Sequence, residues 1–211
     1  MTRHELVKKY IPRPRTTVMR LETPPDEARH RLESVGAEFE EVSDGWRARL
    51  GGGVVVADGD GVVLHGNTDR LRRILQDGAG KVTVAFDGAS RGNPGPSAAA
   101  YVLTDEDGVV KREGAAIGEA TNNEAEYVAL LRGLVEAREL GYAVVEAVGD
   151  SELVVRQVDG DWRCRADNLQ PLCDEVREVA ESFDEFEIRH VPRAENQAAD
   201  ELANETLDSE T

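Results

Sequence analysis

The stretch KVTVAFDGASRGNPGPSAAAYVLTDEDG, residues 81–108, decides the fold predicted for the larger part of the chain. Two runs rich in β-branched and small residues flank the turn sequence RGNPGP, which is typical of two adjacent strands joined by a tight connection. In the first run, Asp87 shares a face with Thr83 and Ala85, opposite Val84. The sequence therefore predicts a strand that carries a carboxylate in line with small side chains, where a ligand has room.

The order of elements after this stretch indicates an α/β domain. The predicted elements are a strand at 109–120, a helix at 121–140 capped by Thr121, a buried strand at 143–150, a helix beginning at Ser151, a helix at 168–183, a strand at 186–192 and a last helix at 195–207. Strands and helices that alternate in this way are typical of a sheet covered by helices.

The sequence before residue 80 predicts a separate, small α+β domain. It opens with a basic arm, whose Arg and Lys residues are Arg3, Lys8, Lys9, Arg13, Arg15 and Arg20. Strands and two helices follow, and QDGAG at 76–80 forms a turn-rich joint. We therefore expect an accessory domain at 1–78, with a substrate-binding role for its basic arm, and a second domain at 81–211.

The charge of the chain is strongly acidic and unevenly distributed. The net charge is -17, from 42 acidic and 25 basic residues, of which only four are lysines. Residues 1–80 carry 13 residues of each sign, so the whole excess lies in 81–211. This bias is typical of proteins adapted to a high-salt, halophilic cytoplasm. Because the Debye length is about 3 Å at molar salt, the acidic surface does not exclude a nucleic-acid partner there.

Nothing in the sequence indicates a membrane protein. No run of 18 or more apolar residues occurs, and no hydrophobic stretch follows the basic residues of MTRHELVKKYIPRPR. We expect a cytoplasmic protein, and no feature of the sequence indicates an obligate protein partner.

Three further carboxylates occupy positions that a plain folding pattern would give to apolar residues. Glu126 lies on a helical stripe with leucine and alanine, Asp150 ends a buried strand, and Asp200 lies among small apolar residues of the last helix. An unpaired carboxylate is costly in such surroundings. Each acid alone is also compatible with a solvated or salt-bridged side chain, and Glu146 shares a face with Asp150, so the choice between these two stays open.

Four sequence blocks follow one another along the chain: DGASRGNPGP, TNNEAEY, GDSELVV and HVPRAENQAADELA. In this order they resemble the motif series of type 1 ribonucleases H, here of a halophilic, archaeal-like kind, over residues 81 to about 207. The resemblance implies an α/β fold with a five-stranded mixed sheet flanked by helices. The small α+β domain would precede it.

The resemblance also implies the chemistry of four acids. The catalytic and metal-binding carboxylates of the family correspond to Asp87, Glu126 rather than Glu124, Asp150 and Asp200. They would hold two Mg²⁺ ions, with Mn²⁺ as an alternative. The implied reaction is endonucleolytic hydrolysis of the RNA strand of an RNA–DNA hybrid, which leaves a 5′-phosphate and a 3′-hydroxyl. Double-stranded RNA stays open as a further substrate.

Polar residues near these acids are candidate substrate contacts. The resemblance assigns Asn93, Asn122 and Asn123 to sugar–phosphate edges and RNA 2′-hydroxyls. His190 resembles the catalytic histidine of the family in its spacing before the last aspartate, and we expect it to assist turnover. Arg193 is expected to be a further substrate contact and is the alternative for the role of His190.

Two departures from the family pattern leave other functions open. The stretch DGDWRCRADN is short where bacterial members often carry a basic, tryptophan-bearing helix, and Glu152 stands where glutamine is common. The alternatives are another nuclease of the same superfamily and a catalytically silent nucleic-acid-binding module. The intact set of four acids and the TNN and NPG blocks favour a ribonuclease H.

Overall fold

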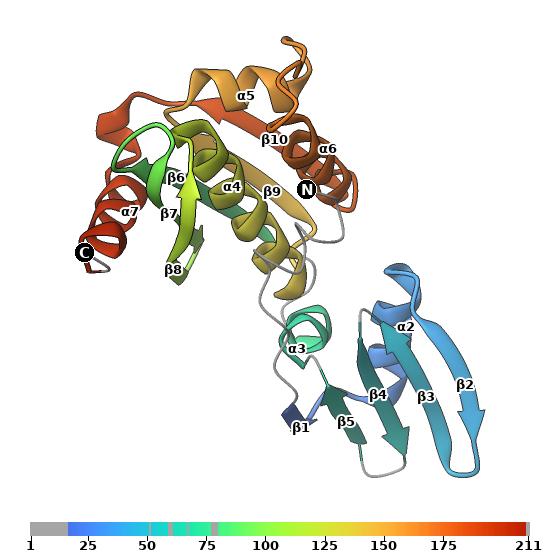
Figure 1. The fold of residues 1–211 in the computed structure, drawn as a ribbon. Helices are drawn as coiled ribbons and strands as arrows, with labels where there is room; N and C mark the ends of the chain where they lie inside the picture. Colours follow the sequence, from blue (N-terminus) through green and yellow to red (C-terminus); the bar gives the residue numbers. More distant parts are fainter. Residues whose placement is uncertain (1–16, 51, 59–60, 67, 77–79, 210–211) are drawn as a thin grey trace. The chain divides into compact units, whose positions relative to one another are not determined.

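The computed structural model describes residues 17–50, 52–58, 61–66, 68–76 and 80–209 (Figure 1). The described residues divide into an N-terminal unit, which comprises 17–80 and 138–142, and a C-terminal unit, which comprises 81–137 and 143–209. The basic arm before residue 17 lies outside the described residues. Within the described part of the chain, none of the helices combines the length and the apolarity needed to span a membrane.

The N-terminal unit is one antiparallel sheet with two helices. Its elements are β1 (Thr17–Leu21), α2 (Pro25–Ser34), β2 (Glu38–Val42), β3 (Gly45–Leu50), β4 (Gly53–Asp58), β5 (Gly61–Gly66) and α3 (Thr68–Gln76). The strand order is β1-β5-β4-β3-β2, so the first strand pairs with the last one. The α+β character predicted for this region is confirmed.

The core of the N-terminal unit lies between its helices and one face of its sheet. Val55 of β4 and Leu64 of β5 are fully buried in a cluster with Leu32 of α2 and Leu71 of α3. Side chains alternate along a strand, so the neighbours of the buried residues, such as Val54 beside Val55, face away from this core and are only half-buried.

The C-terminal unit contains a five-stranded mixed sheet. Its elements are β6 (Lys81–Ser90), β7 (Gly95–Asp105), β8 (Gly108–Ala120), α4 (Asn122–Glu139), β9 (Val144–Gly149), α5 (Glu152–Asp159), α6 (Gln170–Ala180), β10 (Glu185–His190), the 3₁₀ turn η1 (Arg193–Glu195) and α7 (Gln197–Ser209). The strand order is β10-β9-β6-β7-β8, in which β6, β9 and β10 run parallel and the other pairs are antiparallel. The predicted order of elements and the predicted sheet are confirmed.

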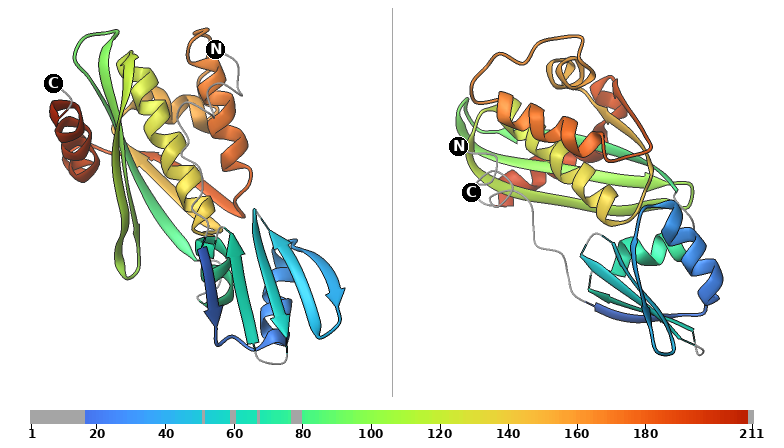
Figure 2. Two further views of the ribbon diagram at one scale, coloured as in Figure 1. Left: turned by 60° about the horizontal axis from the view of Figure 1, so that its bottom comes forward. Right: turned by 90° about the vertical axis from the view of Figure 1, so that its right-hand side faces the viewer.

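Helices cover both faces of this sheet. Figure 2 shows α4 and α6 on one face and α7 on the other. Val84 and Phe86 of β6 are fully buried, as are Leu130 and Leu134 of α4. On the other face, α7 packs against β6, β7 and β8 through small residues such as Ala203. The sheet is therefore the central layer of three.

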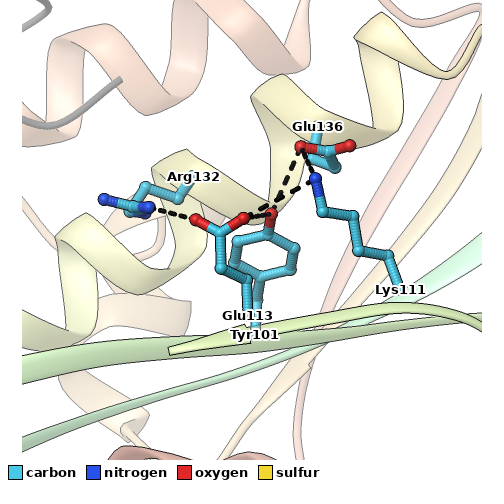
Figure 3. A network of polar contacts seen from close by, with 5 residues as sticks. All are labelled: Tyr101, Lys111, Glu113, Arg132 and Glu136. Atoms are coloured by element: carbon cyan, nitrogen blue, oxygen red, sulfur yellow. Dashed lines mark hydrogen bonds and ion pairs between the residues drawn. The ribbon is translucent and has the colours of Figure 1, made fainter. Parts of the chain in front are cut away.

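A polar network connects α4 to the strands β7 and β8 (Figure 3). The buried Tyr101 hydroxyl lies 3.3 Å from a carboxylate oxygen of Glu113 and 3.3 Å from one of Glu136. Lys111 pairs with Glu136 at 2.7 Å, and Arg132 pairs with Glu113. Since partly buried pairs within one network hold their geometry better than isolated surface pairs, the network fixes α4 on the sheet.

Candidate active site

Asp87 lies in the middle strand of the C-terminal sheet and is buried, with an exposed fraction of 5%. The next residue, Gly88, lies against the first turn of α4. A Cβ atom on Gly88 would lie 2.3 Å from the backbone nitrogen of Glu126 and 2.4 Å from the carbonyl carbon of Ala125. Only glycine allows this approach, which places the strand backbone of Asp87 directly beside the helix that carries Glu126.

Glu126 is also 5% exposed, and the start of α4 explains its position. The Thr121 backbone N–H donates to Glu124 Oε2 at 2.8 Å, and the Glu124 N–H donates to Thr121 Oγ1 at 3.3 Å. This reciprocal pair is a capping box. Glu124 is therefore used to cap the helix, while Glu126 points into the unit and one of its carboxylate oxygens has no hydrogen-bond partner among the described residues.

Asp150 follows the last residue of β9 and is half-buried. Glu146, on the same face of the strand, pairs with Arg189 at 2.5 Å and with Lys81 at 3.4 Å. The hydrogen bond from Arg189 lowers the pKa of Glu146. This acid is therefore ionised, and the positive charges of Arg189 and Lys81 balance its negative charge. The strand pattern did not show which of these two acids belongs to the site. In the structure Glu146 is salt-bridged, whereas Asp150 lies with Asp87 and Glu126.

The carboxylates of Asp87, Glu126 and Asp150 converge on one point. Each offers an oxygen, and the three oxygens lie within 4.8 Å of one another. They line an open cavity of about 340 Å³, together with Asp200 and Arg193. Four acids from β6, α4, the end of β9 and α7 therefore meet in one polar cavity.

The pKa values of two acids in this cluster are raised. Burial, together with the charges of Asp150 and Asp200, raises the pKa of Asp87 to about 7. Burial also raises the pKa of Glu126 well above its ordinary value, and the charges of Asp87 and Asp150 add to the shift, whereas the Gly88 N–H that donates to Glu126 opposes it. Without a cation the cluster therefore retains protons that exposed carboxyl groups would lose.

Asp200, in the first turn of α7, is held by two neighbours. Arg193 of η1 donates a hydrogen bond to its carboxylate. Asn204, one turn further along the helix, donates to the same carboxylate at 3.2 Å and to the Asp200 backbone carbonyl at 2.9 Å. The hydrogen bond with Asp200 raises the pKa of Arg193, so a permanent positive charge lines the acidic cavity.

The candidate substrate residues lie at different places around the cavity. Asn122 lines it, and Asn93 accepts a hydrogen bond from the Asn122 N–H at 3.2 Å. Asn123 and His190 are described but are not among the lining residues. His190 is the last residue of β10, and its ring lies 3.2 Å from the backbone carbonyl oxygen of Asp150.

Two asparagines at this site were missed by the sequence analysis. Asn204 holds Asp200, and Asn196 is a 1% exposed residue that donates to the Phe86 carbonyl at 2.9 Å. The block HVPRAENQAADELA contains Asn196, but an asparagine before a helix ordinarily indicates only a cap. The signal for Asn204 is its spacing of four residues after Asp200, which places both on one helical face.

The carboxylate cluster fits a divalent cation. Oxygen atoms are the ligands that Mg²⁺, Mn²⁺ and Ca²⁺ prefer, and the three oxygens are close enough to share an ion. The unpartnered oxygen of Glu126 is buried, which costs free energy unless a proton or a cation compensates for it. The residues that would hold the ion are Asp87, Glu126 and Asp150, with Asp200 at the same cavity.

Comparison with known proteins gives consistent matches. The reverse transcriptase-like family model matches residues 85–206. Ribonuclease HI of Halobacterium salinarum is 44% identical over 190 residues, which cover 86% of this chain and 94% of that protein. Since the C-terminal unit is shorter than 190 residues, the alignment includes part of the N-terminal unit.

Two solved structures share the C-terminal fold. RNase H1 from Halobacterium salinarum NRC-1 matches with a TM-score of 0.60 and 48% identity, over 62% of this chain and 99% of that chain. LC11-RNase H1, solved in complex with an RNA/DNA hybrid, matches with a TM-score of 0.57 and 36% identity, over 61% and 97%.

The fold and the site together define an α/β protein whose buried carboxylates, set on a mixed sheet and its helices, suit divalent cations. The family match over residues 85–206 and the 44% identity to ribonuclease HI make the assignment specific. The chain belongs to the type 1 ribonuclease H family, and it is a hydrolase.

Proposed function

We propose that this protein is an endoribonuclease that hydrolyses the RNA strand of RNA–DNA hybrids and leaves 5′-phosphate and 3′-hydroxyl ends. The observation that carries the proposal is the convergence of Asp87, Glu126 and Asp150, with oxygens within 4.8 Å of one another. A plain core position would hold an apolar side chain at Glu126, so the cost of burying these acids indicates a function.

The acids would act by holding two Mg²⁺ ions, with Mn²⁺ as an alternative. When bound, such ions stabilise the attacking and leaving oxygens of an in-line displacement at phosphorus. Asp87 and Glu126, on a rigid strand and helix, provide fixed ligands, and the protons that the cluster retains would be released on binding. Asp200 stays oriented toward the cavity because Arg193 and Asn204 hold it.

Arg193 is the stronger candidate for the role that assists turnover. Arg193 lines the cavity and pairs with Asp200, whereas His190 does not line the cavity and contacts the Asp150 backbone carbonyl. A guanidinium is always protonated, so Arg193 would act by charge, stabilising the phosphate or the departing product, rather than by proton transfer.

Substrate contacts would come from both units. Asn122 lines the cavity, and the bond from its backbone N–H to Asn93 orients the turn of residues 91–96 beside it. The basic arm that opens the expected accessory domain, residues 1–78, would add phosphate contacts that the acidic C-terminal unit lacks. We also infer a halophilic, cytoplasmic enzyme from the excess of acids and the scarcity of lysine.

A cleavage assay with three duplexes tests the proposal. The protein is incubated at molar salt with end-labelled RNA–DNA, RNA–RNA and DNA–DNA duplexes of one sequence, with Mg²⁺, with Mn²⁺, or with chelator. We expect cleavage of the RNA strand of the hybrid, only with a divalent ion, to products with a 3′-hydroxyl that a polymerase extends.

The other outcomes separate the alternatives. Binding of the hybrid without cleavage in either metal would support a catalytically silent module. Cleavage of the DNA duplex, or stepwise removal of end nucleotides, would point to another nuclease of the superfamily. Cleavage of the RNA–RNA duplex at a comparable rate would extend the substrate range to double-stranded RNA.

A further inference from the structure

Asn196 is the best-buried amide side chain of the C-terminal unit that the proposed function does not use. Its exposed fraction is 1%, and it lies between η1 and α7, four residues before Asp200. An asparagine directly before a helix ordinarily accepts a hydrogen bond from the helix through its side-chain oxygen. Asn196 does not, because its Oδ1 atom has no hydrogen-bond partner among the described residues.

The side chain of Asn196 bonds to the middle strand of the sheet instead of its own helix. Its Nδ2 donates to the backbone carbonyl of Phe86 at 2.9 Å, and Phe86 directly precedes Asp87. The bond spans 110 residues of sequence. It therefore ties the start of α7 to the strand that carries the most central acid of the site.

The backbone of Asn196 connects the same point to the other side of the cavity. Its N–H donates to the Arg193 carbonyl at 3.0 Å, which closes η1. Its carbonyl accepts from the N–H groups of Ala199 and Asp200, both at 3.1 Å, which begins α7. One residue thus contacts the segments that carry Asp87, Arg193 and Asp200.

The unpartnered oxygen argues against a role in folding alone. A buried carbonyl oxygen without a donor destabilises the folded protein, and an apolar residue of similar size would avoid that loss. The Nδ2 bond to Phe86 is what such an apolar residue could not supply. The Asn196 side chain is therefore better explained by a role in placing α7 against β6 than by a role in core packing.

We propose that Asn196 is a positioning residue, which holds Arg193 and Asp200 in register with Asp87 by bonding α7 and η1 to β6. The inference rests on the proposed function, because it concerns the same cavity. Asn196 itself does not line the cavity, so it acts through Asp200 and Arg193.

The test compares Asn196→Ala with Gln197→Ala. Gln197 is the exposed neighbour at the first position of α7, so the control removes an amide one residue away. Three quantities are measured: the thermal midpoint, the affinity for Mn²⁺ by calorimetry without substrate, and kcat and KM on the hybrid. We expect Asn196→Ala to weaken Mn²⁺ binding and lower kcat, each by about 10- to 100-fold, with KM nearly unchanged. Gln197→Ala should match the wild type.

A second variant covers the case in which Asn196→Ala does not fold. Asn196→Asp has almost the same shape, but at neutral pH it places an oxygen opposite the Phe86 carbonyl, and the same losses are expected. A folded variant with wild-type Mn²⁺ affinity and kcat overturns the proposal, as does loss of the fold in both variants, which would assign Asn196 to structure. If the wild type itself does not cleave the hybrid, the proposed function fails instead.

Discussion

The two units of this protein differ in how many polar side chains they bury. Among the described residues, the buried polar or charged side chains of the C-terminal unit are Asp87, Ser97, Glu126, Gln157, Glu175 and Asn196, whereas the N-terminal unit buries only Thr68. The charges of the N-terminal unit instead pair at the surface, as in Arg29 with Glu41 and Arg31 with Glu27. Both units have an apolar core between a sheet and helices.

This difference distinguishes exposed charges, which keep a surface soluble, from buried carboxylates, which indicate a chemical role. A surface pair contributes little to stability, because water and salt already neutralise each partner. A buried carboxylate lowers stability unless a proton, a cation or a donor compensates for it. The C-terminal unit has this loss at Asp87 and Glu126, whereas no acid of the N-terminal unit whose side chain the structure describes is buried.

The largest expected effect comes from removing a charge of the buried cluster. Asp87→Asn, Glu126→Gln and Asp150→Asn should each lower kcat on the hybrid by about a thousandfold or more while the circular dichroism spectrum stays unchanged, because each loses a metal-binding charge. Glu146→Gln is the matched control, since Glu146 lies on the same strand face as Asp150 but is salt-bridged. Near-normal cleavage by Asp150→Asn would refute the cluster as the catalytic centre.

The second effect distinguishes a residue that lines the cavity from one that does not. Arg193→Ala should lower kcat by about a hundredfold, because a fixed positive charge beside Asp200 is removed. His190→Ala should change kcat much less and leave binding of the hybrid and the metal unchanged. Single-turnover and steady-state rates measured on both variants check this, and a slow His190→Ala with a normal Arg193→Ala would return the role to the histidine.

The third effect concerns the N-terminal unit. Removing residues 1–78 should weaken hybrid binding about tenfold and make its dependence on salt shallower, by roughly 0.9 in log–log slope for each phosphate that the shortened chain no longer neutralises. The matching Halobacterium structure contains little beyond the C-terminal fold, so a shortened chain is expected to fold. Fluorescence anisotropy over a salt series provides the measurement. If the full-length and shortened chains bind the hybrid with equal affinity and equal salt dependence, residues 1–78 have no role in substrate binding.

The fourth effect is a dependence of stability on pH in the absence of metal. The pKa of Asp87 is raised from 3.8 to about 7, so the folded protein keeps a proton that the unfolded chain loses between these values. The free energy of unfolding should therefore fall as the pH rises through that window. In chelator, the thermal midpoint of the wild type should drop by about 5 °C more than that of Asp87→Asn between pH 5 and pH 7.5. Parallel curves would contradict the raised pKa.

The smallest effect is expected at a surface pair of the N-terminal unit. Glu41→Gln breaks the ion pair of 2.8 Å with Arg29, whose partners are both solvent-exposed. The thermal midpoint should move by no more than about 2 °C at high salt, because the pair is already screened. A shift as large as that produced in the buried cluster would remove the distinction between the two units.

The architecture of the C-terminal unit could be predicted because its signals are local. The alternation around Asp87, the capping residue Thr121 and the apolar stripe of α4 each depend on neighbours in sequence, and the structure follows them. The sheet order of the N-terminal unit was not predicted. The pairing of β1 with β5 joins residues far apart in the chain, and strand patterns alone do not specify such partners.

The candidate site shows the same limit. The four acids were identified from the order of the motifs. The alternation along the strand did not by itself separate Asp150 from Glu146, because their difference lies in the long-range partners Lys81 and Arg189. Asn196 was missed for a related reason. Its bond to Phe86 connects residues 110 positions apart, whereas its local surroundings indicate a helix cap.

Gly88 has a consequence for how the protein can vary. Because a Cβ atom at this position would lie 2.3 Å from the backbone nitrogen of Glu126, the gap between β6 and α4 is set by backbone against backbone. Side chains elsewhere in the core can change without altering that gap. Mutational tolerance should accordingly be uneven: a saturation library would accept many apolar replacements around the site and almost none at position 88, where even alanine forces the two acids apart.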